Sequence, residues 1–237
     1  MKRALATLLV LAGCWGLLHW PVHTRQGVDY QLVERTIPLY VKLGRFLYRD
    51  LEYRVLVREI TRGIAGEEGK ALALYDWVRT HVHHGIPKGM PVVDDHVWHI
   101  IVRGYGTPDQ LADVLATLCA YGGLPADVVG LGPPGRRPVH AVTMVRIGGA
   151  WHPLDPYYGV VVRSGPQRVA SREEILANLQ LVRAAAPALA VDGIDYAQLY
   201  QWLPAMKPNA DLRPYRHQPL LRAWYELRRL WHQERVL

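Results

Sequence analysis

The sequence predicts an α+β fold in which one central helix packs on an antiparallel sheet, with helical extensions at both ends and an N-terminal membrane anchor. The core is predicted by a sharply delimited amphipathic helix at residues 108–121 and by the strand-like runs that follow it at 126–131, 139–147 and 150–154. The anchor is predicted by an apolar run that follows two basic residues at the start of the chain.

The composition is that of a folded, basic protein. The 237 residues are 50% hydrophobic and carry a net charge of +7, enough for one domain with a substantial core. Most of the positive charge is arginine, and no nucleic-acid-binding motif accompanies it, so we expect an anionic lipid or glycan or an envelope protein as partner, and no nucleic acid. The two cysteines, Cys14 and Cys119, leave no disulfide within the domain.

The N-terminus has the layout of an export signal or signal anchor. Lys2 and Arg3 precede an apolar run over residues 4–20, which as a helix of about 17 residues would span roughly 25 Å of a bilayer core of about 30 Å. Alternatively, Leu11-Ala12-Gly13-Cys14 resembles a bacterial lipobox, with Cys14 as the lipidated residue. Both interpretations tether the domain to a membrane, facing the periplasm or the exterior of a bacterial-type envelope.

Changes in pattern along the chain predict its divisions. Apolar residues at intervals of three and four over residues 30–64 predict one or two helices, broken near Pro38 or Gly44. Four prolines among polar residues predict a linker near the C-terminus. The predicted segments are 1–22 as signal anchor or lipoprotein-type signal, 23–65 as helical extension, 66–170 as core, 171–203 as helical C-terminal part, 204–219 as linker and 220–237 as basic amphipathic helix.

A histidine-rich segment leads into the core. A helix is predicted over 67–84, ended by Gly85-Ile86-Pro87. The potential metal ligands around it are His81, His83, His84, Asp94, Asp95, His96 and His99. A metal site needs three or four ligands that converge on the ion, whereas imidazoles in a basic, loop-rich segment are more often solvated or hydrogen-bonded to neighbours. We therefore predict no metal and no cofactor, with His99 as a candidate for lining a cleft.

The central helix has clear start and stop signals. Thr107 is the predicted N-cap, Pro108 takes the first helical position, and Gln110 completes a capping box. Gly122-Gly123 ends the helix. One apolar stripe must face the core; it consists of Leu111, Val114, Leu115, Leu118 and Cys119.

The strands that follow bring a histidine and an aspartate together. Gly148-Gly149 predicts a two-residue hairpin turn that pairs Ile147 with Ala150 and therefore Val142 with Asp155. His140 lies two residues before Val142 and shares its face, so it is a diagonal neighbour of Asp155 at roughly 7 Å. Register alone predicts contact between the two side chains.

The spacing of His140, Val145, Trp151, Asp155 and Pro156, behind a helix tip and a strand, resembles the transglutaminase-like domain of the papain-like cysteine enzymes. The resemblance implies a papain/transglutaminase-like core. It also implies a cysteine nucleophile at the helix N-terminus, a histidine base on one strand and an aspartate on the next strand that orients the histidine. A thiolate at such a tip gains from the helix dipole and from an adjacent base.

The chain departs from this pattern at the nucleophile. The family's G-x-G-x-C-x-Q-x-A run corresponds to Gly104, Gly106, Pro108, Gln110 and Ala112, so that Pro108 replaces the cysteine. The resemblance therefore implies a vestigial dyad, with His140 and Asp155 in the places of base and orienting acid. Trp151 and Gln110 are further cleft candidates. Cys119 lies roughly 16 Å along the helix from its tip and is assigned to the core.

The C-terminal region is predicted to be helical. Ser171 and Glu174 form a second capping box that opens a helix to about Ala185, and residues 194–203 predict another short helix. Residues 220–237 combine an apolar stripe with four arginines. Such a helix can lie on a membrane, dock on a partner or pack on its own domain.

Three functions remain open from the sequence. The favoured one is a membrane-anchored, extracytoplasmic transglutaminase-like domain that lacks catalysis and serves as a binding or scaffolding module. The second is an active hydrolase or acyltransferase that uses Thr107, a water activated by His140, or a metal ion. The third is a structural subunit of an envelope complex, held through its C-terminal helix.

Overall fold

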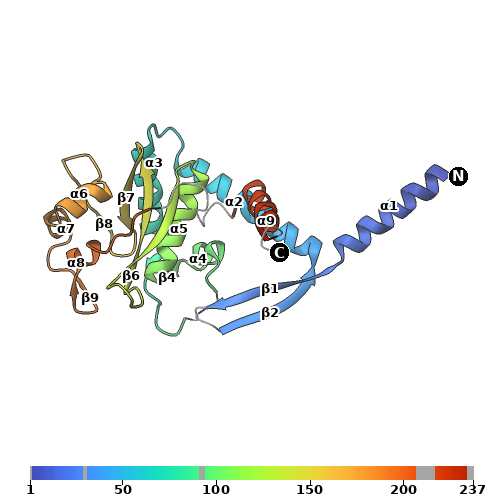
Figure 1. The fold of residues 1–237 in the computed structure, drawn as a ribbon, viewed down its shortest axis with the longest axis horizontal. Coiled ribbons are helices and arrows are strands. Elements are labelled where there is room, and N and C mark those ends of the chain that lie inside the picture. The colour runs from blue at the N-terminus through green and yellow to red at the C-terminus, as the bar shows by residue number, and fades with distance from the viewer. Residues whose placement is uncertain (1, 29–30, 91–93, 207–216, 234–237) are drawn as a thin grey trace.

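The computed structural model describes residues 2–28, 31–90, 94–206 and 217–233 (Figure 1). The helices are α1 (Lys2–Leu18), α2 (Leu39–Ile60), α3 (Glu67–His81), α4 (Val97–Arg103), α5 (Pro108–Tyr121), α6 (Arg172–Ala177), α7 (Gln180–Ala185), α8 (Tyr196–Tyr200) and α9 (Pro219–Gln233). The strands are β1 (Pro21–Val28), β2 (Gln31–Pro38), β3 (His83–His84), β4 (Tyr105–Gly106), β5 (Ala126–Leu131), β6 (His140–Ile147), β7 (Ala150–Asp155), β8 (Val160–Val161), β9 (Ala190–Val191) and β10 (Ile194–Asp195).

The central sheet is antiparallel, with strand order β5-β6-β7-β8. Ile147 lies opposite Ala150, and the pairing continues to Thr143 opposite Leu154, which confirms the predicted hairpin register. Gly148 and Gly149 both have positive φ values, of 57° and 87°, as the turn requires. The predicted mixed architecture of helices and an antiparallel sheet is therefore confirmed.

Helices cover both faces of this sheet (Figure 1). On one face, Val145, Ile147 and Leu154 join a core with residues of α2, α3, α4 and α5. On the other face, Val142 and Met144 join a second core with residues of α6, α7 and α8. The alternation of side chains along β6 thus assigns successive residues to different cores.

Helix α5 is the most deeply buried helix of the first core. Every residue from Gln110 to Ala120 is buried. The predicted N-terminal signals are confirmed, because Thr107 is the N-cap, Pro108 lies in the first turn and Gln110 forms the capping box. The helix runs as far as Tyr121, where Gly122 follows as the C-cap.

The helical prediction for the first part of the N-terminal extension is wrong. Residues 21–28 and 31–38 form the antiparallel strands β1 and β2, with Pro21 paired to Pro38. The spacing of Leu32, Val33, Thr36 and Ile37 fits a helix, but three of these four residues are β-branched and favour a strand. Of the two alternative breaks, the one at Pro38 is confirmed, because β2 ends there and α2 begins at Leu39, whereas α2 is continuous through Gly44 to Ile60.

The C-terminal part differs from the prediction in two places. Of the helix predicted over residues 194–203, the first two residues form β10 and only Tyr196–Tyr200 form a helix, α8. The helix predicted to run from Ser171 to Ala185 is divided into α6 and α7. Asn178 ends α6 with φ −148°, and its side-chain oxygen accepts a hydrogen bond from the backbone N–H of Gln180 at 3.1 Å. This local bond competes with a continuous helix. Most of the predicted linker, and the last four residues of the predicted C-terminal helix, lie outside the described residues.

The expected membrane anchor corresponds to α1, which has 17 residues. Within the described parts of the chain, no helix is both long and apolar enough to cross a bilayer. The side chains of α1 are nevertheless exposed, and Leu9 and Trp15 are 66% and 68% accessible.

Candidate functional site

The structure brings His140 and Asp155 into direct contact on the sheet. His140 begins β6 and Asp155 ends β7, and the imidazole Nε2 lies 2.6 Å from Asp155 Oδ2. Both side chains are completely buried. A carboxylate only accepts hydrogen bonds, so Nε2 carries the proton of the neutral ring and Nδ1 is the basic nitrogen.

Asp155 is held by further donors from two directions. Its Oδ1 accepts hydrogen bonds from the backbone N–H groups of Tyr157, at 2.8 Å, and of Tyr158, at 3.1 Å. Its Oδ2 also accepts from the hydroxyl of Tyr196, which is itself 3.0 Å from the hydroxyl of Tyr200. Burial, together with the negative charge of Asp155, raises the pKa of Tyr196 well above its usual value. The phenol therefore remains a donor at neutral pH.

Aromatic rings enclose the imidazole. The ring centroid of His140 lies 4.9 Å from that of Tyr158, 5.9 Å from Tyr196 and 6.1 Å from Tyr157. Nδ1 is buried, and it has no hydrogen-bond partner in the part of the chain that the structure describes. The pair is thus a sealed hydrogen-bonded unit with one unused acceptor.

His140, which carries this unused acceptor, lies at the end of β6 nearest the start of α5. Thr143 Oγ1 donates to the carbonyl of Ala112 at 2.8 Å, which fixes the two elements side by side. Leu124 N–H donates to Cys119 O, and Ala126 pairs with Val145, so the later part of α5 accompanies the later part of β6. His140, at the beginning of β6, therefore lies toward the helix tip.

No thiol stands at that tip. Pro108, half-buried, occupies the first helical position. The hydroxyl of neighbouring Thr107 donates to Asp109 Oδ1 at 2.6 Å, and its backbone N–H donates to Gln110 Oε1 at 3.1 Å. Cys119 is completely buried, and burial raises the pKa of its thiol. It belongs to the first core, as the sequence predicted.

Three other predicted cleft residues are not brought together. Trp151 lies opposite Arg146 and packs on the second core, four residues and roughly 13 Å along β7 from Asp155. His99 lies in α4, where its Nδ1 is 2.6 Å from Asp94 Oδ2. Gln110 supports the α5 tip and donates to Asp95 Oδ1 at 2.6 Å. Sequence spacing did not reveal that these residues serve different parts of the fold.

The histidine-rich segment is likewise dispersed. His81 stacks on Trp77, His83 and His84 form β3, and His96 caps α4. Among the described residues, no group of three or more His, Cys, Asp or Glu side chains could hold a metal ion. The alternative of a metal-dependent hydrolase therefore has no ligand set in that part of the chain.

Among the described residues, Tyr196 is a side-chain partner of the pair that the sequence did not suggest. It lies 41 residues beyond Asp155, on the short helix α8. No motif marks it, and only the packing of α8 on the sheet brings its hydroxyl to the carboxylate.

Comparison with solved structures found partial similarities to three proteins. A presumed protease from Parabacteroides distasonis is 16% identical, with 57% of this chain and 35% of that protein covered and a TM-score of 0.39. A presumed cysteine protease from Cytophaga hutchinsonii is 22% identical, with coverages of 50% and 43% and a TM-score of 0.39. A protein described as a TGase is 15% identical, with coverages of 62% and 46% and a TM-score of 0.36. The chain thus spans less than half the length of each.

A search of the curated proteins found no match. The family model described as the transglutaminase-like superfamily does match, over residues 54–156. The match contains α5, the sheet strands β5 to β7 and the His140–Asp155 pair, and it ends directly after Asp155. The similarity of this chain to the transglutaminase-like superfamily therefore covers residues 54–156.

Proposed function

We propose that this transglutaminase-like domain is non-catalytic and acts as a binding or scaffolding module in a cell envelope. The observation that carries the proposal is the combination of a completely buried His140–Asp155 pair with a proline at the start of α5. A substrate cannot reach an imidazole that is sealed by aromatic rings. Proline also offers no atom that could attack a carbonyl group.

The hydrogen bonds of the pair support a structural role. Asp155 accepts from His140, Tyr196 and two backbone N–H groups, so it joins β6, β7, the turn after β7 and α8. A satisfied buried network of this kind makes one packing arrangement unique. In this proposal the former catalytic pair now fixes the second core.

The same proposal places the module at a membrane, outside the cytoplasm. Its support is the exposed apolar surface of α1, together with Lys2 and Arg3 before it. The C-terminal α9 adds exposed apolar side chains, because Leu220 is 86% and Trp224 66% accessible. We infer that α1 attaches the chain to the bilayer and that α9 is the surface offered to an envelope partner.

Restoring a thiol at the helix tip tests whether Pro108 occupies the nucleophile position. If position 108 is the nucleophile position, the new thiol of Pro108→Cys has the helix dipole and His140 Nδ1 beside it, both of which favour the thiolate. We expect iodoacetamide to alkylate this variant near pH 7 at least tenfold faster than it alkylates Asp109→Cys. That matched control keeps the thiol in the same helical turn, but one position away.

Peptide mass mapping separates the engineered thiols from Cys14 and Cys119, and the wild-type chain supplies the background rate. Equal alkylation rates in the two variants would mean that position 108 gains nothing from His140. The interpretation of Pro108 as the replaced nucleophile would then be wrong.

A further inference from the structure

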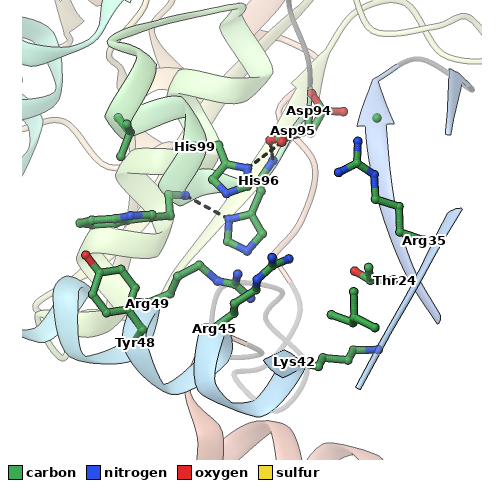
Figure 2. Close-up of a pocket in the computed structure, with 14 residues that line it drawn as sticks. Thr24, Arg35, Lys42, Arg45, Tyr48, Arg49, Asp94, Asp95, His96 and His99 are labelled. Carbon is green, nitrogen blue, oxygen red and sulfur yellow. Dashed lines mark hydrogen bonds and ion pairs between the residues drawn. The ribbon is translucent and has the colours of Figure 1, made fainter. Parts of the chain in front are cut away.

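A cavity lies between the β1–β2 hairpin, α2 and residues 94–102, away from the His140–Asp155 pair. It has a volume of about 740 Å³. Figure 2 shows side chains from α2, from the hairpin and from the start of α4 pointing toward one space. None of its lining residues belongs to the central sheet. The cavity is of the size that accepts a small organic ligand.

Cationic side chains dominate the cavity wall. Lys42, Arg45 and Arg49 follow one another along α2 at intervals of three and four, which aligns them on one face of the helix. Arg35 approaches from β2 on the opposite side (Figure 2). Four cations from two separate elements therefore surround the space.

The two acidic residues of the wall already accept hydrogen bonds from neighbouring residues of this chain. Asp94 accepts from the ring of His99 and from the backbone N–H of His96, at 2.6 and 3.0 Å. Asp95 accepts from Gln110 at 2.6 Å. Arg45 and Arg49, in contrast, make no hydrogen bond or ion pair with any other residue that the structure describes. The cavity therefore presents an excess of positive charge.

The environment of Arg49 is unfavourable for a positive charge when no ligand is bound. Its guanidinium is half-buried, and burial is the main cause that lowers its pKa, with a smaller contribution from the like charge of Arg45. Asp94 offsets only part of this cost, and a desolvated cation with so little compensating negative charge is unfavourable. A bound anion would supply the missing charge.

His96 adds a neutral donor to the wall. Burial lowers its pKa to about 3, and the positive charge of Arg49 contributes. Its Nδ1 accepts the backbone N–H of Trp98 at 3.2 Å, so the proton of the neutral ring is on Nε2. A wall of arginines and a ring N–H matches an acceptor-rich anion.

We propose that this cavity binds a phosphate ester. The cations from α2 and β2 neutralise and bracket the phosphate oxygens, which can accept from several directions at once. Ile37, Trp98 and Val102 supply apolar wall for the organic part of the ligand. The ester is either the headgroup of an anionic phospholipid or a soluble phosphate compound.

Calorimetric titration of the purified full chain tests the site with inorganic phosphate, glycerol phosphate and phosphatidylcholine vesicles that contain phosphatidylglycerol. Arg45→Gln and Arg49→Gln should each weaken binding at least tenfold, because each removes charge-assisted hydrogen bonds. Arg58→Gln is the matched control. It removes the same charge from the exposed end of α2, outside the cavity, and should leave the affinity unchanged.

Thermal unfolding supplies a second readout. Arg49→Gln should be at least as stable as the wild type without ligand, and phosphate should raise the unfolding temperature of the wild type but not of this variant. Binding of glycerol phosphate alone would identify a soluble ligand. Vesicle binding that phosphatidylglycerol strengthens relative to pure phosphatidylcholine, and that Arg45→Gln weakens, would identify a headgroup. The proposal is overturned if no probe binds, or if Arg58→Gln weakens binding as much as Arg45→Gln does.

Discussion

Asp155→Ala is expected to lower the free energy of unfolding by about 3–5 kcal/mol, because it leaves several buried hydrogen-bond donors without an acceptor, at roughly 1–3 kcal/mol for each fully buried one. The change leaves the imidazole of His140, the hydroxyl of Tyr196 and the N–H groups of Tyr157 and Tyr158 without their shared acceptor. All of these groups surround the completely buried carboxylate. Urea unfolding followed by circular dichroism measures the difference.

The matched control is Asp76→Ala, which removes an exposed carboxylate from α3 and should change stability by less than about 0.5 kcal/mol. Asp155→Asn should fall between the two, because its amide oxygen can still accept from the backbone N–H groups. If Asp155→Ala were as stable as Asp76→Ala, the pair would not fix the core as proposed here.

Deleting residues 1–20 is expected to abolish membrane attachment. The deletion removes nine large, exposed apolar side chains, each of which gains roughly 1.5–3 kcal/mol on leaving water. Flotation of the purified protein with neutral phosphatidylcholine vesicles measures attachment without help from the basic surface. The full chain should float with the vesicles, and the deletion variant should stay at the bottom of the gradient.

Cys14→Ser separates the two interpretations of the N-terminus. The variant keeps α1 intact, so it should still float if apolar contact with the bilayer holds the chain. If Cys14→Ser fails to float, a lipid on Cys14 holds the chain instead. If the deletion variant floats as well as the full chain does, α1 does not attach the chain to the bilayer.

Sequence patterns located the sheet and the central helix because local signals fix both. Gly148-Gly149 determines the turn, and the period of two then sets every partner from Ile147 to Thr143. Thr107 and Pro108 mark the start of α5, since capping and proline act within one helical turn. The contact between His140 and Asp155 followed from that register.

The β1–β2 hairpin and the cavity beside it were missed for two physical reasons. Short β-branched segments satisfy helical and strand periodicity equally well, so residues 31–38 were assigned to the wrong class. The cavity joins residues from three elements that are up to about 75 positions apart. No single window of the sequence contains Arg35, Arg49 and His96 together in a recognisable order.

Trp151 and Tyr196 both show that a sequence motif does not predict which side chains meet in the fold. Trp151 belongs to the motif that suggested the family, yet it packs at the far end of β7 from Asp155. Tyr196 belongs to no motif, yet its hydroxyl bonds to the carboxylate. Tertiary packing decides which side chains meet, and a linear pattern does not record it.

Hydrolysis of p-nitrophenyl acetate by the purified full chain tests most directly whether the His140–Asp155 pair is non-catalytic. We expect the wild type to hydrolyse the ester at the same rate as equal amounts of the Thr107→Ala and His140→Gln variants. The reason is that neither Thr107 nor His140 supplies or activates a nucleophile in the wild type. A wild-type rate that falls at least tenfold in His140→Gln, while that variant keeps its circular dichroism spectrum, would contradict the account.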